Sequence, residues 1–540
     1  MALNDPTVLA EASSEDTWWR HAVCYEVYVR SFADSDGDGI GDLPGITSRL
    51  PYLRDLGVDA LWITPFYSSP QKDHGYDVAD YRDVDPLFGQ LADADHLIER
   101  AHALGLRVIV DLVPNHSSDQ HAWFQAALAA GPGSPERARY VFRDADPDDP
   151  ERRPNNWRSV FGGPAWTQVP DGQWYLHLFD STQPDFDWRN PEVAEMFEDV
   201  LRFWLDRGVD GFRIDVAHGL FKAEGMPDQE RPSAHENSGG SAISEGEMVA
   251  APPADDPMWD QPEVHDVYRR WHHILEEYDG DRMAVAEAWT PTPESMARYV
   301  RPDELSQAFN FAWLLAPWSA PAFAEVITGT LEAVQPVGAS PTWVLSNHDV
   351  VRHRTRYGGG ELGLARARAA ILTMLALPGS AYVYQGEELG LEQADVEPEN
   401  RSDPSWFRTG EAGRDGCRVP IPWGGSEPPF EFGPGTGQPW IPQPAEWKGL
   451  TVEAQADDPS STLSFYREAL AHRRAFATTA GETVTMLSLG PDVLAFARGP
   501  LTVVLNCGTA PVDLPDGEVV FGSARLRGGH LPPDAAVWLR

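Results

Sequence analysis

The stretch VLRFWLDRGVDGFRIDV, residues 200–216, decides which fold the chain is expected to adopt. Its first half places apolar residues at the spacing of an amphipathic helix, and Gly208 stands where such a helix would end. Its second half alternates apolar and charged residues and is typical of a β-strand. The segments 52–65 and 98–116 repeat this order of helix, glycine and apolar strand. Helices that alternate with buried strands predict βα units around a parallel sheet.

Five further apolar runs bring the number of candidate strands to eight. They lie at residues 22–32, 283–289, 307–311, 341–349 and 380–388. Eight parallel strands with helices between them predict an α/β fold, the (β/α)8 or TIM barrel. In such a barrel the carboxyl ends of the strands meet at one mouth, and the active site lies there.

The spacing of the repeated units predicts an insertion into the barrel. The interval between Gly105 and Gly208 is about twice the interval between Gly57 and Gly105. A segment rich in Pro, Asp and Trp, without helical periodicity, fills the difference, so we expect a small irregular subdomain after strand 3. Short strands and turns near the C-terminus predict a small all-β domain. The expected division is 1–116 for the first part of the barrel, 117–188 for the inserted subdomain, 189–474 for the second part of the barrel and 475–540 for the β domain.

Two further excursions leave the ends of the fourth and eighth strands. The first, 218–260, is dense in Gly, Ser, Pro and acidic residues, and the second, 391–445, is rich in Pro and Gly. Such compositions are typical of surface loops, and we expect the first to be mobile. Both excursions should crowd the barrel mouth.

Composition excludes several classes of partner. The 540 residues include 83 acidic and 42 basic residues, for a net charge of −41, which argues against nucleic acid and against an anionic membrane. The three cysteines are far apart and odd in number, which favours a reducing compartment. The first residues lack the features of a signal peptide, and the longest apolar run, 369–377, is too short to span a bilayer. We therefore expect a soluble, cytoplasmic protein.

Acidic and basic side chains follow several predicted strands. Arg213 and Asp215 lie two residues apart on one strand and so share a face, where the guanidinium favours the ionised form of Asp215. Glu287 ends a different strand at the same mouth. Two carboxyl groups about 5–5.5 Å apart form the machinery of a retaining glycosidase, one as the nucleophile and the other as the proton donor with a raised pKa. A purely structural buried ion pair is the alternative for Arg213 and Asp215.

Four short motifs stand in an order that marks a known family. They are DLVPNH (111–116), GFRIDV (211–216), AEAW (286–289) and LSNHD (345–349). With them the chain resembles the α-amylase superfamily of glycoside hydrolases, in its α-glucosidase and oligo-1,6-glucosidase branch, over residues 18–474. The resemblance implies that the nucleophile is Asp215, that the general acid/base is Glu287, that the third carboxylate, which holds the distorted sugar, is Asp349, and that hydroxyls of the same ring are bound by His116 and His348.

Other segments resemble the exo-acting members of that branch. DHGY (73–76) corresponds to the closed end of their pocket, where Asp73 would bind the terminal 4-hydroxyl and Tyr76 would stack on the sugar. Asp73 would pair with the second arginine of GRDGCR, which is Arg418. A pocket closed in this way admits only the glucose at a non-reducing end.

The inserted subdomain carries further features of the glucosidase branch. PNNWRSVFGGPAW (154–166) and QPDFDW (183–188) resemble its signatures, and the implied site residues are Phe161, Phe179 and Gln183. The usual form of the second motif has Leu and Asn where this chain has Phe186 and Asp187, which leaves the linkage preference open. Val216, after the nucleophile, accompanies tolerance of α-1,6 linkages in the related branch.

The loop DSDGDGIGD, residues 34–42, begins like the calcium loop of an EF-hand. It departs from that motif because position twelve is Gly45 in place of Glu. The branch resembles this chain in a single-turn cation loop, and the implied ligands are Asp34, Asp36, Asp38, Asp42 and the Ile40 carbonyl. An all-oxygen, flexible loop favours a structural Ca²⁺ over Mg²⁺. An acidic turn without metal is the alternative.

Three functions remain compatible with the sequence. The first is a retaining exo-α-glucosidase acting on short oligosaccharides of the maltose or isomaltose type. The second is an α-transglucosylase or glucoside isomerase, similar to trehalose synthase, in which a sugar hydroxyl in place of water attacks the same covalent intermediate. The third is a catalytically silent, amylase-like binding protein, which the presence of all three acids disfavours. No organic cofactor is expected for any of them.

Overall fold

Eight parallel strands form the core of the computed structural model, which describes residues 17–230, 255–435 and 437–540. Their order in the sheet is β11-β10-β9-β5-β2-β1-β13-β12. A parallel bridge between Phe309 and Thr342 joins the two ends of this order, so the sheet curves into a barrel. The strands are β1 (Val23–Val27), β2 (Ala60–Ile63), β5 (Arg107–Leu112), β9 (Gly211–Ile214), β10 (Met283–Ala286), β11 (Gln307–Ala308), β12 (Thr342–Val344) and β13 (Ser380–Tyr384). Each lies within a predicted strand, and the predicted (β/α)8 fold is confirmed.

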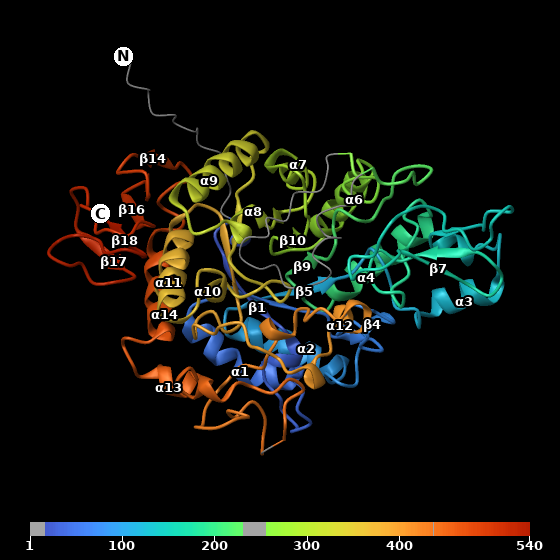
Figure 1. The fold of residues 1–540 in the computed structure, drawn as a ribbon, viewed down its shortest axis with the longest axis horizontal. Helices are drawn as coiled ribbons and strands as arrows, with labels where there is room; N and C mark the ends of the chain where they lie inside the picture. The colour runs from blue at the N-terminus through green and yellow to red at the C-terminus, as the bar shows by residue number, and fades with distance from the viewer. Residues whose placement is uncertain (1–16, 231–254, 436) are drawn as a thin grey trace, which may run out of the picture.

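Helices connect successive strands and cover the outside of the barrel (Figure 1). The principal ones are α1 (Leu43–Leu56), α2 (Leu91–Ala103), α4 (Pro191–Leu205), α6 (Val264–Glu276), α7 (Pro293–Arg298), α9 (Ala320–Val334), α11 (Gly360–Ala376) and α14 (Thr462–Phe476). Shorter elements in the connections are β3 (Tyr67–Ser68), β4 (Asp80–Val84), α8 (Phe311–Leu315), α10 (His353–Arg356) and α13 (Val452–Ala456).

The α4–β9 unit shows how the repeated sequence pattern folds. Asn190 caps the amino end of α4 by accepting the backbone N–H of Glu192 at 3.0 Å. The helix buries one apolar face, which includes Phe197 and Trp204. Gly208, with φ +98°, then turns the chain toward β9, in a backbone conformation that glycine adopts without a steric penalty. The strand is fully buried, so its residues lie between the helical layer and the barrel interior.

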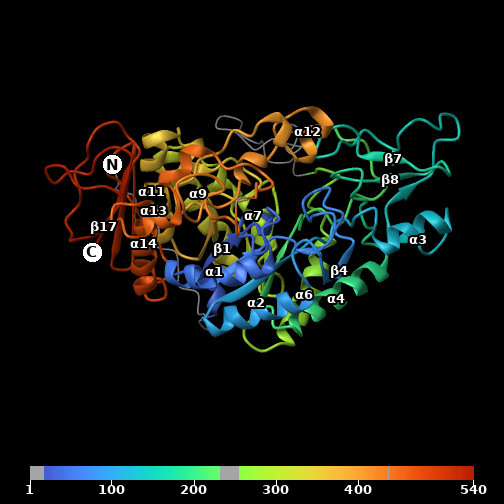
Figure 2. The same ribbon diagram turned by 90° about the horizontal axis from the view of Figure 1, so that it is seen from below.

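Residues 117–188 project from one side of the barrel, at the right of Figures 1 and 2. They hold a three-stranded sheet in the order β6-β8-β7. Its elements are β6 (Phe142–Arg143), β7 (Trp166–Gln168) and β8 (Trp174–Leu176). The segment also forms a helix, α3 (Ala122–Ala130), that the sequence pattern did not indicate. The Ala-rich sequence AWFQAALAA has high helix propensity but no narrow apolar stripe, so periodicity alone missed it.

The C-terminal residues form a separate antiparallel sheet in the order β14-β15-β16-β18-β17, at the left of Figure 1. The strands are β14 (Thr485–Leu487), β15 (Val493–Arg498), β16 (Leu501–Asn506), β17 (Val519–Gly522) and β18 (Ala535–Leu539). Trp538 fastens this sheet to the barrel because its buried indole N–H donates to the Leu372 carbonyl in α11 at 3.0 Å. The predicted C-terminal β domain is confirmed.

The excursion after β13 crosses toward the inserted subdomain (Figure 2). It contains α12 (Pro404–Thr409), whose Arg408 contacts the Gly162 carbonyl at 2.8 Å and the Asp180 carboxylate at 2.9 Å. Of the predicted mobile loop 218–260, residues 231–254 lie outside the described residues. None of the described helices combines the length and the apolar character that a membrane span requires.

Candidate active site

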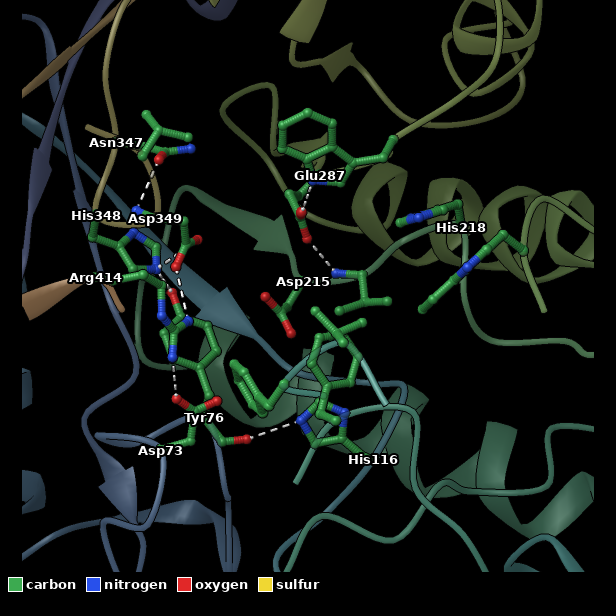
Figure 3. Close-up of a pocket in the computed structure, with 17 residues that line it drawn as sticks. Asp73, Tyr76, His116, Asp215, His218, Glu287, Asn347, His348, Asp349 and Arg414 are labelled. Carbon is green, nitrogen blue, oxygen red and sulfur yellow. Dashed lines mark hydrogen bonds and ion pairs between the residues drawn. The ribbon is translucent and has the colours of Figure 1, made fainter. Parts of the chain in front are cut away.

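The carboxyl ends of the barrel strands surround one pocket (Figure 3). Its lining includes ten of the predicted site residues: Asp73, Tyr76, His116, Phe161, Phe179, Asp215, Val216, Glu287, His348 and Asp349. Three others are buried and do not line the pocket: Gln183, Arg213 and Arg418. The three predicted catalytic acids therefore come together from three different strands, since Asp215 follows β9, Glu287 follows β10 and Asp349 follows β12.

Arg213 is a buried cation that contacts three acids at or near the pocket. Its guanidinium lies 2.5 Å from Asp215, 3.0 Å from Asp111 and 3.5 Å from Glu287, measured nitrogen to oxygen. The side chain is only 1% exposed, so these charges interact in a medium that screens them weakly. One buried cation thus orients the two predicted reacting acids at once, which a purely structural ion pair would not require.

Glu287 has the environment of a proton donor. The backbone N–H of Val216 donates to Oε2 at 2.6 Å, and the indole N–H of Trp289 donates to Oε1 at 2.8 Å. Burial raises the pKa of Glu287 to about 7, although Arg213 opposes the shift. A carboxyl group with this pKa is about half protonated at neutral pH and can donate its proton.

Asp215 competes with Glu287 for the charge of Arg213. Burial outweighs the opposing effect of Arg213 and raises the pKa of Asp215 well above its ordinary value, and the charge of Glu287 adds to the rise. The contact of Asp215 with the guanidinium is shorter by 1.0 Å than that of Glu287, at 2.5 Å against 3.5 Å. The closer guanidinium therefore favours Asp215 over Glu287 as the ionised member of the pair.

Arg414 joins Asp73 and Asp349 in the lining of the pocket. Arg414 contacts Asp73 at 2.8 Å and Asp349 at 3.0 Å, and a third carboxylate, Asp403, at 2.6 Å. The predicted partner of Asp73 was Arg418, and that pairing is wrong. Arg418 instead lies 2.9 Å from Asp349. The two arginines are four residues apart in an irregular segment, where no periodicity indicates which one faces Asp73.

Neighbouring groups keep the Asp349 carboxylate ionised. Burial raises its pKa, but His348, Arg414 and Arg418 outweigh that effect and hold the pKa well below its usual range. Its side chain is 31% exposed, and this exposed part faces the pocket. Asp349 is therefore an ionised acceptor that a sugar hydroxyl can reach.

Neutral donors and rings complete the wall near Asp73. Gln183 donates to Asp73 Oδ2 at 3.0 Å from behind the pocket, and the His116 ring packs against Phe179 at 4.9 Å between ring centroids with an interplanar angle of 45°. Burial lowers the pKa of His116 to about 4, so its ring is neutral at neutral pH. Tyr76 stacks on His348 at 5.3 Å with an interplanar angle of 10°. The His116 and His348 rings and the Tyr76 hydroxyl line the pocket and can exchange hydrogen bonds with a neutral sugar without adding charge.

Several pocket residues were missed by the sequence analysis. They are Val160, His218, Trp259, Trp289, Asn347, Val350 and Arg414. Four of them stood inside motifs already recognised: Val160 in PNNWRSVFGGPAW, Trp289 in AEAW, Asn347 in LSNHD and Arg414 in GRDGCR. His218 and Trp259 stack at 4.9 Å although they are far apart in sequence, and no local pattern could have joined them.

The acidic loop before α1 places three carboxylates together. Oxygens of Asp34, Asp36 and Asp42 lie within 4.8 Å of one another. Asp38 is not part of that group, and its carboxylate accepts the backbone N–H of Ile40 at 2.8 Å. Burial raises the pKa of Asp42, and the charge of Asp34 adds to the shift. The geometry therefore supports three of the five predicted metal ligands as one cluster.

Comparison with known proteins identifies close similarity over most of the chain. Residues 26–481 match the family model described as alpha amylase, catalytic domain. A probable alpha-glucosidase of Rhizobium meliloti is 37% identical over 92% of this chain and 90% of its own length. An oligo-1,6-glucosidase of Parageobacillus thermoglucosidasius is 34% identical over 85% of this chain and 84% of its own. The crystal structure of the alpha-glucosyl transfer enzyme XgtA superposes with a TM-score of 0.87 at 38% identity, over 97% of this chain and 100% of the other.

Proposed function

The chain belongs to the alpha-amylase family, and from that premise we propose that it is a retaining exo-acting α-glucosidase that releases terminal glucose from short oligosaccharides. The observation that carries the proposal is the ion-paired wall formed by Asp73, Arg414 and Asp349. This wall blocks the pocket beyond the first sugar unit, so a longer chain has no path through it. Only the glucose at a chain end reaches the acids.

The reaction proceeds by two displacements at the anomeric carbon. The ionised Asp215 attacks that carbon while Glu287 gives its proton to the oxygen of the departing sugar, which breaks the glycosidic bond and forms a covalent glucosyl-enzyme. Glu287, now ionised, takes a proton from a water molecule, and the resulting oxygen nucleophile displaces Asp215. Two inversions restore the α configuration, and both acids return to their starting states.

The remaining pocket residues hold the terminal glucose. Asp73 and Arg414 bind hydroxyls at the closed end, and Asp349 accepts from hydroxyls of the distorted ring as positive charge develops at the anomeric carbon. Arg213 keeps Asp215 ionised and aimed. His116 and His348 complete the hydrogen bonds to the same sugar ring.

Product analysis tests this proposal directly. Maltotriose is incubated with the enzyme, and products are followed by proton NMR from the first minutes. Glucose and maltose are expected as the only early products, with the new glucose in the α form before mutarotation. Asp215→Asn should abolish turnover with unchanged circular dichroism. Early β-glucose would refute the retaining mechanism, and cleavage inside maltoheptaose would refute the exo assignment.

Transglucosylation is the second candidate, and the apolar rim of the pocket favours it. Phe161, Phe179, Val216, Trp259 and Trp289 line the pocket beside the acids. An apolar rim holds a sugar face and lowers the local availability of water, so an acceptor hydroxyl can compete for the glucosyl-enzyme. Rising maltose concentration should then increase trisaccharide at the expense of free glucose. The same experiment on sucrose would detect isomerisation.

The third candidate, a catalytically silent binding protein, would be excluded by turnover of any of these sugars.

Linkage preference depends on the first sugar after the cleavage point. Val216 lies directly after the proposed nucleophile and lines the pocket, where its side chain can contact that sugar. We propose tolerance of α-1,6 linkages on this basis. The ratio of kcat/KM on isomaltose to that on maltose measures it, and a ratio that Val216→Thr leaves unchanged would contradict the role of this side chain.

We propose that the acidic loop holds a structural Ca²⁺. The support is the convergence of Asp34, Asp36 and Asp42, whose crowded carboxylates repel one another without a cation. Asp42 also caps α1 by accepting the Gly45 N–H at 2.6 Å, so a bound cation would stabilise the start of that helix. Asp38 and the Ile40 carbonyl are proposed as additional ligands from the resemblance alone. The ion takes no part in the reaction.

We also propose the cytoplasm as the compartment. All three cysteines are unpaired, and Cys24 and Cys417 are buried. Free thiols are typical of a reducing compartment. Fractionation of the native cells tests this, and recovery of the activity outside the cytoplasm would contradict it.

A further inference from the structure

One buried carboxyl group near the pocket has no role in the reaction described above. Glu26 lies on β1, and its side chain is 1% exposed. It shares a strand face with Cys24, which belongs to the apolar cluster inside the barrel together with Trp62 and Val285. A carboxyl group in such surroundings costs free energy unless its hydrogen-bonding capacity is used. Its partners therefore indicate why it is there.

Both polar contacts of this carboxyl group within the described residues go to His348. Oε1 lies 2.5 Å from Nδ1 of the ring, and the backbone N–H of His348 donates to the same oxygen at 3.3 Å. The ring lines the pocket on its other side, where Nε2 lies 2.8 Å from the Tyr76 hydroxyl and 3.2 Å from Asp349 Oδ2 (Figure 3). Glu26 thus binds the buried edge of the His348 ring, and the opposite edge of that ring faces the pocket.

The hydrogen-bond directions around His348 are determined by its neighbours. The Tyr76 hydroxyl donates its only hydrogen to Asp111 at 3.0 Å, so its oxygen must accept from His348. Asp349 is ionised and can only accept. Both neighbours therefore require a hydrogen on Nε2, and Nδ1 is the position that Glu26 controls.

Protonation of the pair agrees with this arrangement. Burial raises the pKa of Glu26 and lowers the pKa of His348. Glu26 accordingly carries a proton, which it shares with Nδ1, and Nε2 keeps its own hydrogen whichever of the two atoms holds the shared one. The geometry makes Glu26 the group that sets the tautomer and the tilt of the ring.

We infer that Glu26 is a positioning residue for the reaction: it binds Nδ1 of His348 and so keeps the Nε2–H directed at Asp349 and at the hydroxyls of the bound glucose. The inference rests on the proposed function, because it takes the pocket to hold a glucose unit. Glu26 itself touches no substrate.

Variants at position 26 test the inference on maltose. Glu26→Leu removes both contacts at similar size and is expected to lower kcat/KM by roughly 10–100-fold. Glu26→Gln should recover most of that loss, because Asp349 favours hydrogen on Nε2 and the amide can turn its NH₂ toward Nδ1. Cys24→Ala, on the same strand face, is the control and should leave the kinetics unchanged. If Glu26→Leu fails to fold, Glu26→Met offers a more adaptable apolar side chain.

A double-mutant cycle separates positioning from general damage. If Glu26 acts through His348, Glu26→Leu should cost little further activity in a His348→Ala background. An equal fold-loss in both backgrounds would overturn the inference. So would wild-type kinetics in Glu26→Leu, or a loss in Glu26→Gln as large as in Glu26→Leu.

A binding measurement tests the positioning role of Glu26 without relying on turnover. 1-Deoxynojirimycin, a glucose-shaped inhibitor, is titrated calorimetrically into each variant. Glu26→Leu should weaken its binding and Glu26→Gln should not. A wild-type protein inactive on α-glucosides would refute the proposed function, while equal inhibitor affinity in wild type and Glu26→Leu would refute the positioning role.

Discussion

The indole N–H of Trp289 donates a hydrogen bond to Oε1 of Glu287 at 2.8 Å, and the same indole ring stacks on Phe311 at 4.0 Å. The stacking fixes the direction of the N–H. The bond favours the ionised form of Glu287, which lies opposite to the shift caused by burial. Trp289 thus opposes the rise that burial causes in the pKa of Glu287, the proposed proton donor.

Trp289→Phe should therefore raise the pKa of Glu287. The first step needs Glu287 protonated, so activity falls as pH rises through this pKa, and the alkaline limb of kcat/KM on maltose should move to higher pH. A hydrogen bond to a charged group is worth roughly 1.5–3 kcal/mol, so a shift of about one to two pH units is expected. Trp318→Phe is the control, since Trp318 donates to the distant Asp534 at 2.9 Å. An unmoved alkaline limb would contradict the role of Trp289.

Arg414→Lys should damage the closed end of the pocket. A single ammonium group cannot reproduce the contacts of the guanidinium with Asp73, Asp349 and Asp403. Leaving buried carboxylates without a partner costs roughly 2–5 kcal/mol, so kcat/KM on maltotriose should fall by about two to three orders of magnitude. Arg401→Lys, in the same excursion, is the matched control. Retained wild-type kcat/KM in Arg414→Lys would show that the wall does not bind the terminal glucose.

Lys222→Met should lower the free energy of unfolding strongly. The buried ammonium of Lys222 lies 2.7 Å from Asp185 and 2.8 Å from the Asn115 side-chain oxygen. Without Lys222 the buried Asp185 carboxylate loses its cationic partner, which costs roughly 3–5 kcal/mol of the free energy of unfolding. Adding Asp185→Asn should restore part of the stability. Arg202→Met, which removes an exposed ion pair with Glu277, should cost less than about 1 kcal/mol in the same denaturant titrations. Equal losses in the two single variants would contradict this account.

Chelation should lower the melting temperature if the acidic loop binds Ca²⁺. A metal that binds only the folded chain stabilises it by mass action, by about 2.7 kcal/mol at a hundredfold excess over Kd. Scanning calorimetry with and without EDTA measures the effect, and elemental analysis counts the metal. Asp36→Asn should abolish the response to EDTA without changing kcat. A melting temperature that EDTA does not change, together with no metal in elemental analysis, would contradict the proposed calcium site.

The sequence predicted the barrel because each strand is an apolar run with its own local signal. Gly57 and Gly208, with φ +100° and +98°, end helical segments before β2 and β9, and such positions are legible from sequence. The partner of Asp73 could not be predicted from the sequence, because Arg414 and Arg418 lie in a loop without periodicity. Glu26 escaped notice for a different reason: a lone acid in an apolar strand acquires meaning only once β1 and the end of β12 are brought together in space.

The ion-paired wall also dictates how products leave. In the proposed exo mechanism the wall closes the rear of the pocket, so glucose stays until the other sugar has departed. Release is therefore ordered, with glucose last, and free glucose should inhibit competitively because it occupies the form of the enzyme that receives substrate. Each cleavage also ends with complete dissociation, since a shortened chain cannot slide forward past the glucose it has just lost. The enzyme must act distributively, and its throughput on a longer oligosaccharide is set by repeated encounters with that substrate.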